Sequence, residues 1–173
     1  MPKTPPPSPS VHAAAEFVDA ADHLKAHEQS IMLFAEGWKT YKQKTFDNAK
    51  WTTRIFRKET AKHIPEKPGV YAFLILPNAA GDLNVSYLMY VGETDRTLRE
   101  RFREYLREAR SDKIRPKLLR VLPLYPDHLF FACCPLPIDV APTAVEAALL
   151  QAFLPPGNDQ VPASVRRPKR AFS

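Results

Sequence analysis

The chain has 173 residues, of which 45% are hydrophobic and 25% are charged, the balance of an ordinary soluble domain. The net charge of +6 favours polyanionic partners such as nucleic acid without requiring one. There is no run of about 18 apolar residues, which argues against a membrane span. The first residues also lack the apolar stretch of a signal peptide, so we expect a cytoplasmic location.

The N-terminal third differs in composition from the rest of the chain. Five prolines in residues 1–10 predict a disordered or polyproline tail. Alanine-rich sequence with helical spacing then predicts a helix from Ser10 to about Glu36, ended by Gly37.

Aromatic and basic residues alternate between Trp38 and Lys62. Such a segment either stacks nucleobases and pairs with phosphates or docks its aromatic side chains onto the main domain, and the two roles are compatible. We favour docking and describe 11–62 as a helical and basic N-terminal arm. At the other end, 161–173 reads as a basic C-terminal tail able to hold phosphates without specificity.

Three predicted strands and two predicted helices follow the arm. An apolar run indicates a buried strand, turn residues separate it from a returning strand, and a third apolar run comes later. The strands are Val70–Leu76, Ser86–Val91 and Asp127–Cys134; the helices begin near Thr97 and at Thr143.

The first of these helices is rich in charge. Its glutamates and arginines lie three apart, as in Glu104 with Arg107, which predicts a solvated and self-paired face. Arg101 lies off the arginine stripe, at the border of the apolar face and one turn before Tyr105. An arginine in that place either extends along the edge of the core or points into a cleft.

The second helix begins with a pattern that resembles a capping box, with Thr143 as the cap and Glu146 three residues later. Glu146 is therefore either a capping acid or a functional carboxylate.

Five short motifs recur in an order that resembles the GIY-YIG nucleases. They are Gly69-Val70-Tyr71, Tyr90-Val91-Gly92, Arg101 in LRERFREY, Glu146 in VEAALLQAF and Asn158 in PPGND. None of these motifs is specific alone, but their order on the expected strands and helices is specific. The resemblance covers about Glu66 to Gln160. It defines a nuclease domain at 63–160.

The resemblance implies an α+β fold, with a small three-stranded antiparallel sheet flanked by helices, here preceded by an N-terminal helical extension. It implies that Glu146 holds Mg²⁺ or Mn²⁺ and that Arg101 contacts the scissile phosphate. Tyr71 and Tyr90 would surround the attacking water, with Tyr71 or a neighbour as general base. Asn158 would brace the site, and Tyr105 stands where many members have histidine and the repair nucleases have tyrosine.

Three features depart from the family pattern. The loop between the two tyrosine motifs is longer than usual. Glu93 follows Tyr-Val-Gly, either as an extra metal contact or as an acid favoured by a helix start. One extra residue lies between Tyr90 and Arg101, so Arg99 is a second candidate for the phosphate contact.

The sequence thus predicts a metal-dependent endonuclease that hydrolyses phosphodiester bonds in DNA. Two alternatives stay open: a non-catalytic nucleic-acid-binding module that keeps the fold, and a nuclease toxin with a partner inhibitor. We expect no membrane partner. The oligomeric state is open, with a homodimer as one way to cut both strands.

Overall fold

The computed structural model describes residues 28–43, 49–77, 85–109 and 124–158. The chain divides into two compact units, Met1–Ser30 and Ile31–Ser173, and every helix and strand given below belongs to the second. Both predicted tails and residues 11–27 of the predicted arm lie outside the described residues.

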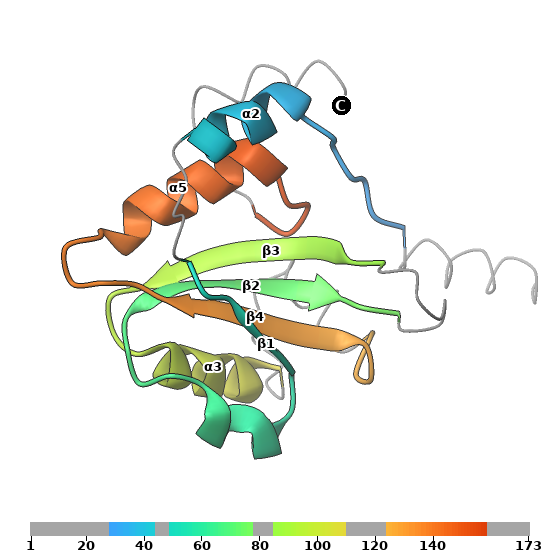
Figure 1. Cartoon of the computed structure of the whole chain (residues 1–173). Coiled ribbons are helices and arrows are strands. Elements are labelled where there is room, and N and C mark those ends of the chain that lie inside the picture. Colours follow the sequence, from blue (N-terminus) through green and yellow to red (C-terminus); the bar gives the residue numbers. More distant parts are fainter. Residues whose placement is uncertain (1–27, 44–48, 78–84, 110–123, 159–173) are drawn as a thin grey trace, which may run out of the picture. The chain divides into compact units, whose positions relative to one another are not determined.

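A four-stranded antiparallel sheet organises the second unit (Figure 1). Its strand order is β1-β4-β2-β3, and each pair of neighbours is antiparallel. The strands are β1 (Thr52–Ile55), β2 (Gly69–Ile75), β3 (Tyr87–Thr94) and β4 (Leu129–Pro135). The expected α+β class with a small antiparallel sheet is confirmed.

The expected number of three strands is wrong, because β1 pairs with β4 as a fourth strand. This strand comes from the segment predicted to be an arm. Its side chains alternate between exposed and half-buried, the pattern of an edge strand, and it contains no apolar run. Phe56, directly after β1, is buried in the core.

Helices cover both faces of the sheet (Figure 1). On one face, α3 (Leu98–Glu108) packs on β2 and β4 and contacts the 3-10 helix η1 (Lys58–His63). On the other, α5 (Pro142–Phe153) packs on β2 and β3 and carries α2 (Ala35–Gln43) on its outer side. Because β2 has helices on both sides, its residues are apolar throughout and nearly all buried.

The two faces hold different cores. Aromatic side chains dominate the α3 face, with Tyr71, Phe73, Phe102, Tyr105 and Phe131 all buried. Smaller side chains fill the α5 face, among them Val70, Ala72, Val91, Ala132, Val145 and Leu149.

The start of α3 is fixed by a capping box. The Thr97 hydroxyl accepts a hydrogen bond from the backbone N–H of Glu100 at 3.1 Å, and the Glu100 carboxylate accepts one from the backbone N–H of Thr97 at 3.1 Å. Two N–H groups that a helix start leaves unpaired are thus satisfied. From this start, Leu98, Phe102 and Tyr105 point into the aromatic core.

The start of α5 differs from the prediction. Its N-cap is Ala141 and Pro142 occupies the first turn, so the predicted capping box from Thr143 to Glu146 is wrong. Proline suits the first helical position because its fixed φ and missing N–H cost nothing there. Glu146 therefore lies within the helix, and capping does not explain its presence.

The predicted helix from Ser10 to Glu36 is also wrong where it is described. Residues 28–34 form no helix, and α2 begins at Ala35 and continues through Gly37. A Cβ on Gly37 would lie 2.6 Å from Cδ1 of Phe34 and 2.7 Å from the carbonyl oxygen of Gln151. Gly37 thus lets α2 approach α5 closely instead of ending a helix.

Within the described ranges, none of the helices combines the length and the apolar character needed to cross a membrane.

Candidate functional site

Tyr71 lies at the centre of the aromatic face of the sheet. It is 1% exposed, and its ring stacks on Phe131 with centroids 5.2 Å apart. Its partner on β3 is Gly92, where a Cβ would lie 2.5 Å from both Cζ and the hydroxyl oxygen of Tyr71. The glycine of Tyr-Val-Gly thus gives the tyrosine of Gly-Val-Tyr the space to lie across β3.

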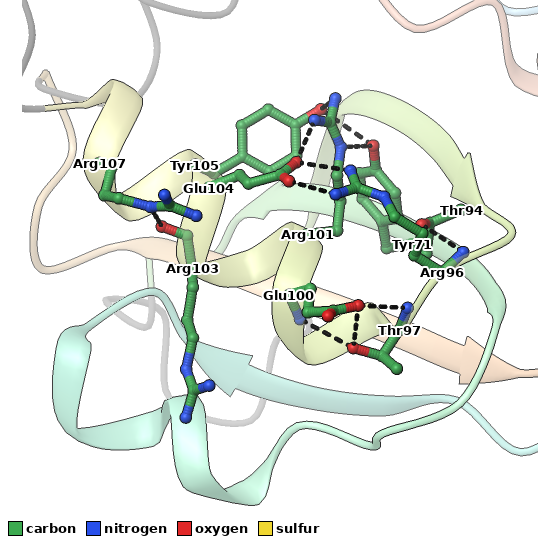
Figure 2. Close-up of polar contacts among 10 residues, drawn as sticks. All are labelled: Tyr71, Thr94, Arg96, Thr97, Glu100, Arg101, Arg103, Glu104, Tyr105 and Arg107. Atoms are coloured by element: carbon green, nitrogen blue, oxygen red, sulfur yellow. Dashed lines mark hydrogen bonds and ion pairs between the residues drawn. The ribbon is translucent and has the colours of Figure 1, made fainter.

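Arg101 joins Tyr71 and Tyr105 in one hydrogen-bonded cluster (Figure 2). Its Nε donates to the Tyr71 hydroxyl and its Nη2 to the Tyr105 hydroxyl, each at 3.0 Å. The two hydroxyl oxygens are 2.9 Å apart and share a hydrogen bond. The guanidinium carbon also lies 4.4 Å from the centroid of the Tyr105 ring, within cation–π range.

This burial makes both phenols hard to ionise. Burial raises the pKa of Tyr71 to about 12, although the charge of Arg101 and the hydrogen bonds from Arg101 and Tyr105 act in the opposite direction. Burial raises the pKa of Tyr105 well above its usual range, and the charges of Tyr71 and Tyr90 add to the rise. Both hydroxyls therefore stay protonated near neutral pH, and a phenolate on Tyr71 would accept hydrogen bonds from Arg101 and Tyr105.

The guanidinium is held firmly in its charged form. Burial acts to lower the pKa of Arg101, but the nearby tyrosine oxygens and the Glu104 carboxylate outweigh it and raise that pKa. The cluster therefore keeps a fixed positive charge beside Tyr71.

Tyr90 lies on the same face of the sheet. It is half-buried, and its ring centroid is 6.3 Å from that of Tyr71 and 6.4 Å from that of Tyr105. The β2–β3 register shifts between Phe73 and Leu74, which leaves Met89 as an extra residue on β3. Tyr90 pairs with Phe73 before this bulge, in the same register that pairs Gly92 with Tyr71, so its ring faces the cluster.

Glu146 comes from the opposite layer, on α5. It is half-buried, and burial together with the charge of Glu93 raises the pKa of its carboxyl. Glu93 pairs with Val70, whose side chain belongs to the core under α5, so this register places both carboxylates on the α5 side. Glu146 therefore belongs to the layer opposite Tyr71, Arg101 and Tyr105, on the helix that packs against edge strand β3.

Glu93 connects the two groups electrostatically. Burial and the charge of Asp95 raise the pKa of its carboxyl, while the charge of Arg101 lowers it. β3 is an edge strand of the sheet, so groups from its two faces can approach each other around that edge. Among the described residues, no cluster of three or more His, Cys, Asp or Glu lies close enough to hold a metal ion.

Asn158 clamps the strand that carries these groups. Its Oδ1 accepts from the backbone N–H of Val91 at 2.9 Å, and its Nδ2 donates to the carbonyl oxygen of Val91 at 2.7 Å. The neighbouring Gly157 donates its backbone N–H to the carbonyl oxygen of Met89 at 2.8 Å. Edge strand β3 thus gains, from the segment after α5, hydrogen bonds that it lacks from a neighbouring strand.

Replacing Asn158 by alanine is expected to lower the free energy of unfolding by roughly 2–4 kcal/mol, because two buried backbone groups of Val91 would lose their partners. Urea denaturation followed by circular dichroism measures this change. A loss below about 0.5 kcal/mol, the range of ordinary surface substitutions, would contradict the clamp.

The structure adds two residues to the cluster that the sequence did not single out. The Glu104 carboxylate contacts Arg101 at 2.8 Å and Arg96 at 2.7 Å, in place of the predicted pair with Arg107 (Figure 2). The spacing of three from Arg101 to Glu104 was a usable signal. Nothing in the helix periodicity points to Arg96, which precedes the helix.

Arg99, the second candidate for the phosphate contact, is used elsewhere. Its Nε donates to the carbonyl oxygen of Ile64 at 2.8 Å and its Nη2 to that of Lys62 at 3.1 Å, while Nη1 contacts the carboxylate of Glu66. It therefore joins α3 to the end of η1 and to the segment after it, and Arg101 alone of the two contacts the tyrosines.

A separate cavity of about 350 Å³ lies on the α5 side of the sheet. Its lining is apolar and aromatic and includes none of the six predicted site residues. It is formed by Tyr41, Trp51, Thr53, Ala72, Leu74, Leu88, Val91, Ala132, Leu149 and Phe153.

In comparisons with family models, with curated proteins and with solved structures, no match to this chain was found.

Proposed function

We propose that this chain is a metal-dependent endonuclease of the GIY-YIG type that hydrolyses phosphodiester bonds in DNA. The observation that carries the proposal is the hydrogen-bonded cluster of Tyr71, Arg101 and Tyr105, contributed by β2 and α3. The motif resemblance groups these residues, and each occupies a buried or half-buried position.

In this proposal Arg101 binds the scissile phosphate. Its side chain is 13% exposed, and in such a water-poor place a positive charge stabilises developing negative charge more strongly than it would in water. Two of its nitrogens are directed at the tyrosines, which fixes the plane of the guanidinium and leaves Nη1 facing Glu104. Nη1 is therefore the nitrogen of Arg101 that a substrate oxygen would contact, because Nε and Nη2 are held by the tyrosines.

Tyr71 is the proposed general base for the attacking water. Hydrogen bonds from Arg101 and Tyr105 stabilise its phenolate, so the small ionised fraction sits beside the arginine that would hold the phosphate. Tyr90, half-buried on the same face, would limit where water and substrate can lie.

The carboxylates of this chain fit a divalent cation. Glu146 is half-buried and repelled by the charge of Glu93, an arrangement that a cation between the two would relieve. Mg²⁺ and Mn²⁺ accept carboxylate oxygens, and Mg²⁺ commonly takes only one or two of them. Glu146, with Glu93 as the second donor, would hold this ion. When bound, it would neutralise charge on the phosphate oxygens.

DNA is the proposed substrate because the net charge of +6 supplies attraction to a phosphate backbone. The same charge predicts binding that weakens as salt rises.

The first test is nicking of a supercoiled plasmid with Mg²⁺, with Mn²⁺ and with EDTA. We expect nicking with either metal and none with EDTA. Glu146→Gln, which keeps the shape but loses the charge, is expected to need at least about ten-fold more Mg²⁺ for half-maximal nicking. Glu59→Gln, at an exposed position on η1, is the matched control and should follow the wild type.

Binding of DNA without nicking under any metal would favour the non-catalytic module instead. Equal metal dependence for Glu146→Gln and wild type would show that the metal site is elsewhere.

A further inference from the structure

Glu104 occupies the open edge of Arg101. The three nitrogens of this guanidinium each donate a hydrogen bond: Nε to Tyr71, Nη2 to Tyr105 and Nη1 to Oε2 of Glu104 at 2.8 Å. Tyr71 and Tyr105 are at most 1% exposed, whereas the Glu104 side chain is 22% exposed. An incoming anion therefore meets Arg101 at the place that Glu104 holds.

A second arginine holds the same carboxylate. Nη1 of Arg96 donates to Oε1 of Glu104 at 2.7 Å and its Nη2 donates to Oε2 at 3.0 Å, so this pair is bidentate (Figure 2). Arg96 precedes α3, and its backbone N–H donates to the Thr94 hydroxyl at 3.2 Å. Glu104 thus receives three N–H groups from two arginines of different segments.

Two arginines around one oxyanion form the arrangement that binds phosphate. The guanidinium fork matches the oxygen spacing of carboxylate and of phosphate alike, so a carboxylate can stand in for a phosphate between the same donors. With Glu104 included, the three side chains carry a net charge of +1, and without it they carry +2. The site is more attractive to an anion once Glu104 has left.

Protonation does not release Glu104. The hydrogen bond from Arg96, supported by Arg101, lowers the pKa of its carboxyl to about 2. The carboxylate is therefore ionised throughout the physiological range, and only another anion can replace it. Because the Glu104 side chain is partly exposed, it can move out into solvent.

We propose that Arg96 and Arg101 form a two-arginine site for one phosphate of a nucleic-acid backbone, and that Glu104 is the internal anion that substrate displaces. This inference rests on the proposed function, to which it adds Arg96 as a substrate-binding residue and Glu104 as a competitor. If Glu104 instead only braced the start of α3, its loss would weaken binding by loosening Arg101.

The test measures binding of a fluorescently labelled DNA duplex in EDTA at several salt concentrations. Glu104→Gln is expected to bind DNA about ten-fold more tightly than its control. This gain follows if Glu104 is displaced from the two arginines in about one-tenth of wild-type molecules. The control is Glu66→Gln, which makes the same charge change and also releases a carboxylate from an arginine, Arg99.

Arg96→Gln is expected to weaken binding at every salt concentration and to reduce the salt slope by about one. A titration with inorganic phosphate, followed by the NMR signals of the arginine Nε–H groups, gives a readout independent of DNA. In the wild type, the signals of Arg96 and Arg101 should shift together as phosphate is added. In Glu104→Gln, the same shifts should occur at a lower phosphate concentration.

The possible results separate this inference from the endonuclease proposal. If Glu104→Gln binds no more tightly than Glu66→Gln, the inference fails even if the wild type cleaves DNA. If the binding order holds while no metal supports cleavage, the phosphate site stands and the endonuclease proposal fails. If neither DNA nor phosphate affects the protein, both fail.

Discussion

Replacing Arg101 by lysine is expected to lower the rate of DNA cleavage by about 10²-fold or more, the cost of removing a preorganised contact to a transition state. Arginine donates at once to Tyr71, Tyr105 and Glu104 from one rigid plane. A lysine ammonium is a point charge on a flexible stem and cannot reproduce this fork. Because the positive charge remains, a loss of activity would show that the arrangement of the guanidinium donors matters.

Single-turnover cleavage with saturating protein measures this effect separately from DNA affinity. Arg103→Lys is the matched control, because Arg103 lies on the same helix with an exposed side chain and should cleave like the wild type. Arg99→Lys tests the second candidate. It should reduce stability, because contacts to η1 and to the segment after it are lost, while the folded protein keeps its rate of cleavage. A rate loss for Arg99→Lys and none for Arg101→Lys would reverse the assignment.

The sequence was sufficient for the parts of the fold with strong local signals. β2, β3 and β4 were predicted to within a few residues because apolar runs bounded by turn residues indicate buried strands. The start of α3 near Thr97 was predicted from charge and periodicity. In each case, neighbours in sequence carry the information.

The elements that were wrong depend on long-range contacts. β1 has the mixed sequence of a half-exposed edge strand, and only its pairing with β4 makes it a strand. Gly37 looks like a helix terminator, but its lack of a side chain serves the contact with Gln151, more than one hundred positions later. The start of α5 is the exception, because the signal there is local: Pro142 lies in the first turn and the N-cap is Ala141, two residues before Thr143.

The candidate site shows the same division. Tyr71, Arg101 and Tyr105 were grouped by the motif resemblance, and one turn of helix between Arg101 and Tyr105 suffices to place both on one side. Glu104 was assigned to Arg107 because helix spacing offers that partner. Its actual contact with Arg96 depends on the side chain of a residue that precedes the helix, which no helix periodicity encodes.

Replacing Tyr71 by phenylalanine is expected to lower cleavage by about 10²-fold or more, as loss of a general base does. The pKa of Tyr71 is raised to about 12, so at neutral pH only a small fraction is phenolate. That fraction increases about tenfold per pH unit below the pKa, and the wild-type rate should rise with it between about pH 6 and pH 9. With phenylalanine at this position, the rate of cleavage should fall and should no longer rise with pH.

Tyr105→Phe is the matched control, because it removes the neighbouring hydroxyl and leaves Tyr71 in contact with Arg101. Without the donor that stabilises the Tyr71 phenolate, this variant should be slower than the wild type but keep the rise of rate with pH. Rates for all three proteins across the pH range, at saturating metal and DNA, decide the assignment. If Tyr71→Phe kept the wild-type rise while Tyr105→Phe lost it, Tyr105 would be the base, and if both kept it, another group would remove the proton from water.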